Sequence, residues 1–420
     1  MGERRPDPSA ISSREHLIHV LTEAAQIEHN LLCSYLYAAF SLKRRGEPGL
    51  QGEQEEAVER WRKTIVKVAL EEMAHLATVN NLLVAVGGAP HFDRANLPLA
   101  PGYHPSGVVV RLTPFTRATL DHFIFLERAD DRELEDAPGF DPIEVERKVR
   151  GGGLTPSAAD YETVGALYDS IAQGLSRLAE RCGEAQLFDA KGSRQLDAEI
   201  SRLPNVRRIT SLEEALGAVA WIKEEGEGSV GGGAGGESHF ERFCAIRDEW
   251  RDLAAEDPAF EPAWPAAHDP VMRKPQPGLE RVWVTQEPSA SLLDLGNALY
   301  GFMLQLLSQT FACDDPADQR RLMNASVELM EGCGAAATGL ARLPASSAHP
   351  GVNAGLTFAV PRNLGFRPVG VARRQLFLER ALELRAGAQR LLGEVSEETS
   401  EKLQRRLDKA VELLGAGASS

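Results

Sequence analysis

Two long amphipathic segments joined by a short turn constrain the fold of this chain more than any other feature. Residues 14–45 carry apolar side chains at helical spacing, and Gly46 and Pro48 end this stretch. Residues 53–86 repeat the pattern and end at Gly87–Gly88. Because two long helices across a short turn pack antiparallel, the sequence predicts a helical hairpin.

The rest of the chain is also predicted to be mainly helical, because apolar residues recur at helical spacing between segments rich in Gly and Pro. The predicted helices span residues 117–128, 158–181 and 211–225, a segment starting near residue 238, and residues 291–312, 317–340 and 373–414, with a break near Gly393. We expect a mainly α protein: a four-helix bundle with long loops and additional C-terminal helices. Residues 1–255 should form the bundle, and residues 256–420 a helical C-terminal region packed on it.

Two segments without helical periodicity are expected to border a substrate entrance. Residues 89–113 are predicted to be a long irregular connection with a strand-like run at 108–112, and loops of this length are usually functional. The glycine-rich segment 228–236 directly joins two candidate site residues, Glu227 and His239. A surface insertion remote from the site is the alternative for this second segment.

Composition limits the partners of the chain. The formal net charge of −15 argues against nucleic acid and anionic membranes, because both require a basic surface. No apolar run follows the N-terminal charges or approaches the roughly eighteen residues of a membrane span, so we expect a cytoplasmic protein. The five cysteines are scattered and never form a CxxC pair, which argues against a thiolate zinc site. We expect a small-molecule substrate as partner, and a homodimer stays open.

The strongest local signal is the ExxH pattern of Glu72 and His75 in the second helix. Side chains three residues apart share a helix face, and two-metal sites in bundles combine this spacing with glutamates from other helices. The alternative is that the ExxH pattern occurs by chance and that both side chains face solvent. Apolar neighbours such as Met73 and Leu76 place the pair beside the buried stripe and favour the metal site.

Glu28 is expected to face Glu72 across the hairpin. Residues equidistant from the turn lie at the same height, and the position midway between these two glutamates is residue 50, inside the turn. A carboxylate between Ile27 and Leu31 would be costly to bury without a partner or a metal, whereas a solvated glutamate at the helix edge is the alternative. His29 points about 100° away around the helix. Histidines without an acidic residue at ligand spacing are expected on the surface or in loops.

The other half of the site should come from the third and fourth helices. Glu227 ends the fourth helix, and His239 lies beyond the glycine-rich segment. Glu162 pairs with Glu227 by the same height argument, because the position midway between them falls near Arg194 in the connection. An ordinary histidine at a helix start is the alternative for His239.

Several segments together carry a family resemblance. They are IEHNLLCSYLYA, VALEEMAHLATVNNLLVAVGGAP, TVGALYDSI, the GEG of EEGEGS, SHFERF, and LMEGCGAAATGLARLP followed by AGLTF. This combination resembles the ferritin-like family that includes iminophenyl-pyruvate dimer synthases, the chromopyrrolate-synthase and violacein-pathway proteins of bis-indole biosynthesis. The resemblance covers about residues 16–358, and EEMAHL with the following GG is its most specific part.

The resemblance implies a ferritin-like bundle and a role in secondary metabolism. It also implies metal ligands at Glu28, Glu72, His75, Glu227 and His239. One position departs from the family pattern, because Ala166 stands where relatives usually carry a glutamate in the third helix. Glu162, one turn earlier, could substitute, or the site could hold one metal ion instead of two. Glu127 is a further candidate.

Three functions remain open from the sequence. The first is a metal-dependent oxidoreductase in which one or two iron ions, or manganese as the alternative, support oxidation of a small amino-acid-derived or natural-product substrate. The second is oxidative coupling of two imino acids with little or no role for metal, and the third is non-catalytic iron binding. No phosphate-binding or nucleophile-elbow motif competes with them.

Overall fold

The computed structural model describes residues 10–100, 102–104, 108–130, 132–141, 156, 159–189, 191–192, 194–227, 237–276, 278 and 281–416. Within these residues the chain forms twelve helices and no strand, with four isolated backbone bridges. The expectation of a mainly α fold is therefore confirmed. No helix in this part of the chain combines the length and apolar composition that a membrane span requires.

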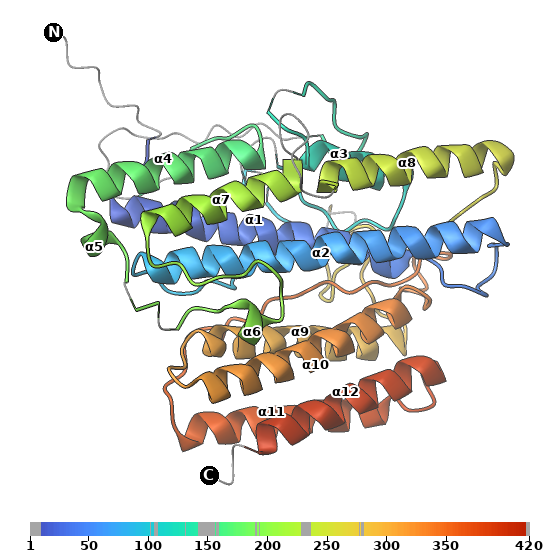
Figure 1. Cartoon of the computed structure of the whole chain (residues 1–420). Coiled ribbons are helices and arrows are strands. Elements are labelled where there is room, and N and C mark those ends of the chain that lie inside the picture. Colours follow the sequence, from blue (N-terminus) through green and yellow to red (C-terminus); the bar gives the residue numbers. More distant parts are fainter. Residues whose placement is uncertain are drawn as a thin grey trace.

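The predicted hairpin consists of α1, Arg14–Ser41, and α2, Glu53–Ala85. Ser13 caps α1, since its hydroxyl accepts a hydrogen bond from the His16 backbone N–H at 3.1 Å. The two helices lie side by side along their length (Figure 1). Their facing sides are buried, polar residues included, so the hairpin places ionisable groups inside the bundle.

Two broken helical layers cover this hairpin. They contain α3, Arg117–Leu126; α4, Val164–Cys182; α7, Leu212–Glu227; and α8, His239–Glu256, with the short helices α5, Glu184–Leu187, and α6, Ala198–Ser201, between α4 and α7. α4 packs on α1 and α7, whereas α3 packs on α8, which also contacts α2. Figure 1 shows α8 following α7 in the same direction above α2. The layer of α4 and α3 and the layer of α7 and α8 are therefore each interrupted near the middle.

Two expectations about this region are wrong. The third bundle helix begins at Val164 and not near residue 158, because Thr163 caps it by accepting from the Ala166 backbone N–H at 3.1 Å. Residues 108–112 do not form a strand. The Leu112 backbone N–H donates to the Asp269 side-chain oxygen Oδ1 at 2.9 Å and not to a neighbouring strand. A single extended run without a neighbouring strand cannot build a ladder.

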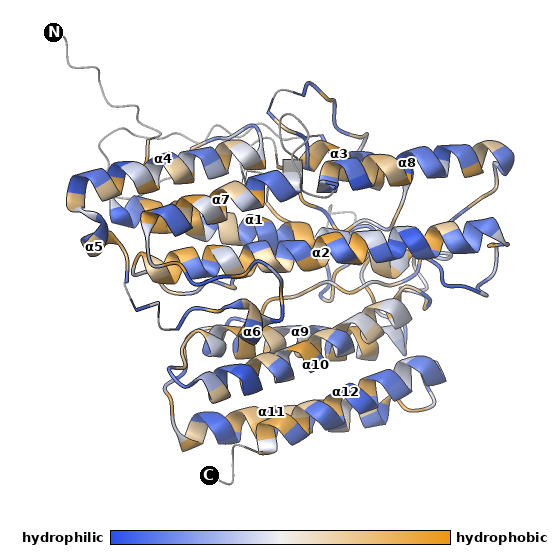
Figure 2. Ribbon diagram, viewed as in Figure 1, coloured by the Kyte–Doolittle hydropathy of each residue, from blue (hydrophilic) through white to orange (hydrophobic). Residues whose placement is uncertain are grey.

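Four C-terminal helices form two further rows. They are α9, Ser289–Thr310; α10, Pro316–Leu340; α11, Val371–Arg390; and α12, Glu397–Gly415. α9 and α10 lie next to the hairpin, and α11 and α12 cover their other side (Figure 1). The expected break lies between α11 and α12, where Gly393 has a φ of 81°. Hydrophilic residues dominate the visible faces of α8 and α12 (Figure 2). The division at residue 255 stays a prediction.

Candidate metal centre

Glu28, Glu72 and His75 meet between α1 and α2. His75 Nδ1 lies 3.2 Å from Glu72 Oε2 and 3.6 Å from Glu28 Oε2. All three side chains are buried, and one ligand atom from each lies within 4.8 Å of the others. The predicted juxtaposition of Glu28 and Glu72 across the hairpin is therefore confirmed, and their role as metal ligands stays a prediction.

A second buried triad combines Glu72 with Glu127 and His239. His239 Nδ1 lies 2.9 Å from Glu72 Oε1 and 3.6 Å from Glu127 Oε2. Glu72 thus belongs to both triads and directs one carboxylate oxygen toward each histidine. Glutamates and histidines that project from several helices into one bundle core are the kind of donors that two-metal bundle sites use.

Each histidine contacts another carboxylate through its remaining nitrogen. His75 Nε2 lies 2.9 Å from Glu225 Oε2, and His239 Nε2 lies 3.2 Å from Glu71 Oε2. Carboxylates in this position fix the tautomer and ring orientation of a metal-binding histidine and increase its basicity. The His75 imidazole therefore has the hydrogen-bonded support that metal ligands normally have, whereas His239 has a close carboxylate without a hydrogen bond of proper geometry.

Two buried tyrosines hold the outer glutamates. The hydroxyl of Tyr168 donates to Glu28, and that of Tyr35 donates to Glu127. Burial, followed by the charge of the bonded glutamate, raises the pKa of each tyrosine well above its usual value, so both stay protonated and remain donors. Each triad is thus held by one tyrosine.

The second triad is built where helices end. Glu127 directly follows α3, His239 is the first residue of α8, and Ser238 caps α8 in a reciprocal capping box with Glu241. Gly226, in the last turn of α7, lets this helix come close, since a Cβ there would lie 3.2 Å from Glu127 Oε2. The breaks in the two outer layers therefore bring these side chains to the hairpin.

Burial and neighbouring charges shift several pKa values in the cluster. Burial, followed by the charge of Glu72, raises the pKa of Glu28 to about 8. Burial opposes the charge on both histidines, yet the carboxylates, Glu72 first for His75 and Glu127 first for His239, raise their pKa values well above the usual range. Burial also opposes ionisation of Glu72, yet the two histidines lower its pKa well below normal. Buried negative charge here requires cations, either protons or metal ions.

The donor set fits a transition metal. Carboxylate oxygens and imidazole nitrogens suit iron and manganese. Both ring nitrogens of His239 are buried and lack a hydrogen-bond partner of proper geometry, although carboxylate oxygens lie close to them. A cavity of about 30 Å³, lined by Glu28, Glu72, His75 and Glu127 among others, adjoins the cluster. A space of this size is large enough for a water molecule.

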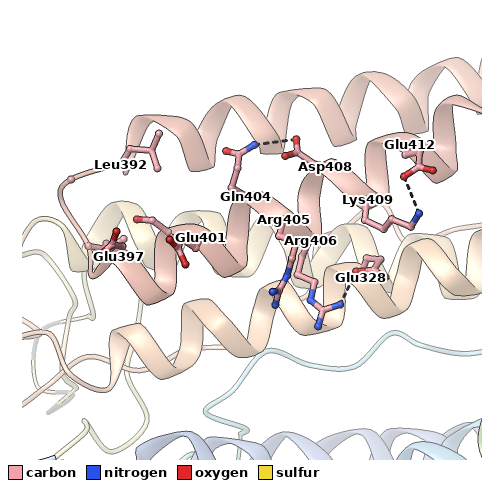
Figure 3. Close-up of a pocket in the computed structure, with 13 residues that line it drawn as sticks. Glu328, Leu392, Glu397, Glu401, Gln404, Arg405, Arg406, Asp408, Lys409 and Glu412 are labelled. Carbon is pink, nitrogen blue, oxygen red and sulfur yellow. Dashed lines mark hydrogen bonds and ion pairs between the residues drawn. The ribbon is translucent and has the colours of Figure 1, made fainter.

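A larger hollow on the surface does not offer comparable chemistry. This groove of about 1060 Å³ lies along α12 and the neighbouring α10 (Figure 3). Two pairs of its charged side chains contact each other: Arg406 Nη1 lies 3.0 Å from Glu328 Oε2, and Lys409 Nζ lies 2.9 Å from Glu412 Oε2. Paired, solvated charges of this kind are ordinary surface features.

Two predicted ligands remain, Glu162 and Glu227. Glu162 is exposed, precedes the cap of α4 and lies outside both triads, so the expectation that it completes the site is wrong. Its backbone oxygen accepts from Arg128 Nη2 at 3.0 Å. Glu227 ends α7, but its side chain lies outside the described part of the chain, as does the segment 228–236.

Other residues have roles that the sequence analysis missed. Glu225 was not a candidate, although it lies three residues after the buried Ile222 and therefore on the same helix face. Tyr35 and Tyr168 carry no motif that distinguishes them from core residues. The expected surface or loop position is wrong for His122, which is buried in α3 with Nδ1 2.8 Å from Asp136 Oδ1.

Comparison with known proteins connects this bundle to characterised families. A family model described as Ferritin-like matches residues 21–248, more than half of the chain. The chain is 28% identical over 409 residues to a dichlorochromopyrrolate synthase of Lentzea aerocolonigenes, an alignment that covers 88% of this chain and 38% of that protein. It is 27% identical over 361 residues to a 2-imino-3-(indol-3-yl)propanoate dimerase of Chromobacterium violaceum, with coverages of 77% and 32%. The chain therefore spans less than half the length of both relatives.

A ferritin-like protein of Caulobacter vibrioides is similar in structure at 18% identity. The TM-score is 0.46, and the similarity covers 75% of this chain and 94% of that protein.

Proposed function

Since the chain belongs to the ferritin-like family, we propose that it is an enzyme of secondary metabolism with a two-metal centre in its bundle. Iron is the metal we propose first, with manganese as the alternative. The proposed reaction is oxidation of a small amino-acid-derived substrate. Two relatives support this proposal, because one is named a dichlorochromopyrrolate synthase and the other a dimerase of the imino acid 2-imino-3-(indol-3-yl)propanoate.

One observation carries the metal proposal: two buried triads share Glu72. Glu28 and His75 would complete the first metal site, and Glu127 and His239 the second. Two bound ions would supply the one-electron steps needed to use oxygen or peroxide as the oxidant. A non-catalytic iron-binding bundle would need the same ligands, so activity must be measured as well as binding.

The surrounding residues would prepare this centre for chemistry. Glu225 holds the outer nitrogen of His75 by a hydrogen bond at 2.9 Å, and Glu71 Oε2 lies 3.2 Å from the outer nitrogen of His239. Tyr168 and Tyr35 hold Glu28 and Glu127 by donating hydrogen bonds. Because these side chains are packed in the bundle, they exclude bulk water and keep the donors in one arrangement before a substrate arrives.

Oxidative coupling of imino acids is the second candidate. The Chromobacterium relative is named a dimerase of 2-imino-3-(indol-3-yl)propanoate, and this name favours coupling of two such molecules. In this candidate the metal is of little or no importance. The two candidates therefore differ in whether turnover depends on the triads.

Metal analysis and turnover together test the proposal. Metal-free protein is reconstituted with ferrous iron under anaerobic conditions, and we expect about two ions per chain. Less than about a tenth of an ion per chain would remove the metal hypothesis. Loaded protein is then given an aromatic imino acid with oxygen or peroxide, and Glu72→Gln is the matched control. Equal turnover by this variant would favour coupling without metal, whereas iron binding without any turnover would favour the non-catalytic alternative.

A further inference from the structure

A second cavity lies between the hairpin and the C-terminal helices. Its volume is about 400 Å³, which is in the range of pockets that bind small organic molecules. It is lined mainly by apolar side chains of α1, α2, α9 and α10. His29 and Met73 line this cavity, whereas the adjacent residues Glu28 and Glu72 belong to the metal centre. α1 and α2 therefore separate the two sites.

The cavity wall is unusually rich in methionine. Of the six methionines in the chain, four line this cavity: Met73, Met303, Met323 and Met330. Methionine side chains are flexible and polarisable, so such a wall can adapt to apolar ligands of different shapes.

Part of the cavity wall is polar. This polar wall contains Tyr300, His29 and Cys33, and the Tyr300 hydroxyl lies 2.5 Å from His29 Nε2. Ser201, Arg202 and Glu331 also line the cavity. Arg94 lies directly behind the wall, where its Nη2 donates to the Tyr300 hydroxyl at 3.1 Å and to the Phe358 carbonyl at 2.8 Å.

The charge of Arg94 has no carboxylate partner among the described residues. Its side chain is only 4% exposed, its recorded partners are a hydroxyl, a thiol and carbonyl groups, and its Nε has no hydrogen-bond partner. A buried guanidinium paired only with neutral groups is costly, and an anion nearby would offset this cost. The alternative is that Arg94 only fastens the segment after α2 to the C-terminal region.

From this combination we infer that the cavity binds a small apolar carboxylate. The apolar body of the ligand would lie among the methionines, and its carboxylate would accept a hydrogen bond from the Tyr300 hydroxyl, with Arg94 behind it as the countercharge. The body could be aromatic or aliphatic, because the lining does not distinguish the two. This site is separate from the metal centre, and the inference does not rest on the proposed reaction.

Calorimetric titration of the metal-free full chain tests the inference. The probes are indole-3-acetate as an aromatic carboxylate, decanoate as an aliphatic carboxylate, and 3-methylindole as a neutral counterpart. We expect at least one carboxylate to bind, and indole-3-acetate to bind about tenfold or more tightly than 3-methylindole if the body is aromatic. If decanoate binds and indole-3-acetate does not, the inference holds for an aliphatic body. Failure of both carboxylates would overturn the inference, and so would binding of both indole-3-acetate and 3-methylindole with equal affinity.

Two variants locate the binding. Met330→Trp fills the cavity and should abolish binding, whereas Leu376→Trp, on the exposed side of α11, is the matched control and should leave it unchanged. Tyr300→Phe removes one hydroxyl and should weaken the carboxylate about tenfold while leaving 3-methylindole unaffected. Circular dichroism checks that each variant is folded. Unchanged carboxylate binding by a folded Met330→Trp variant would place the ligand elsewhere and refute the assignment.

Discussion

Replacing Glu72 with glutamine should remove both metal sites at once. The carboxylate has its Oε2 3.2 Å from His75 Nδ1 and its Oε1 2.9 Å from His239 Nδ1. In glutamine one of these oxygens becomes an NH₂ group, so at least one triad loses a donor outright and both lose the negative charge. Loss of an outer partner of a ligand already costs about 10–100-fold in metal affinity. We therefore expect at least about 100-fold weaker binding at both sites, equivalent to about 2.7 kcal/mol at each.

Anaerobic titration with ferrous iron, followed by elemental analysis, measures this effect. Wild-type protein should bind about two ions per chain, Glu28→Gln and Glu127→Gln about one, and Glu72→Gln close to none. The two single-triad variants are matched controls, because each replaces one buried carboxylate group by the same amide. The reasoning would be refuted if Glu72→Gln still bound two ions with wild-type affinity, or if it lost only one.

Three further predictions follow from the same cluster, and a fourth concerns the glycine-rich segment. Tyr168→Phe should weaken metal binding only about tenfold, since the tyrosine contacts the ligand Glu28 and not the ion; equilibrium titration checks this. Glu162→Ala should have a smaller effect than His75→Ala on the iron content, because Glu162 is exposed outside both triads. The pKa values of His75, His239 and Glu28 are raised in the folded state, so protonation of these groups stabilises metal-free protein. Calorimetry should therefore show a loss of thermal stability as the pH rises from about 6 toward 9. Titration should show that iron affinity increases over the same range, because the ligands lose their protons. Deleting residues 231–236 should alter turnover or substrate binding without changing the melting temperature; unaltered kinetics in folded, metal-loaded protein would count against a gating role.

The hairpin half of the centre could be predicted because its geometry is local. Helical periodicity defines which face of α1 and α2 is buried, and the short turn fixes the height of each residue relative to the other helix. Glu28 and Glu72 therefore meet as expected, within one triad. No information from distant parts of the chain was needed.

The other half could not be predicted in the same way. The height argument for Glu162 assumed a continuous third helix, whereas the residues that reach Glu72 follow or begin separate helices. Glu127 precedes α4 in the sequence and contributes from the end of α3, which packs on α8. Sequence spacing within one helix contains no information about how two broken layers align.

The cavity behind the hairpin was also beyond the sequence pattern. Its wall combines residues as distant as Cys33 and Phe358, which meet only because α9 and α10 pack beside α1 and α2. Arg94 appears in the sequence as one charged residue in a long irregular segment. Its burial and its neutral partners depend on contacts with the C-terminal third of the chain.

The carboxylate shared by the two triads also has a thermodynamic consequence. A cation in one triad, either a proton or a metal ion, changes the negative charge that Glu72 contributes to the other triad. The resulting interaction energy is reciprocal. A cation in the first triad therefore changes the affinity of the second by the same factor as a cation in the second changes the affinity of the first. Two binding events that share one ligand cannot be described by two independent constants, and a binding curve for this protein should be analysed with a coupling constant.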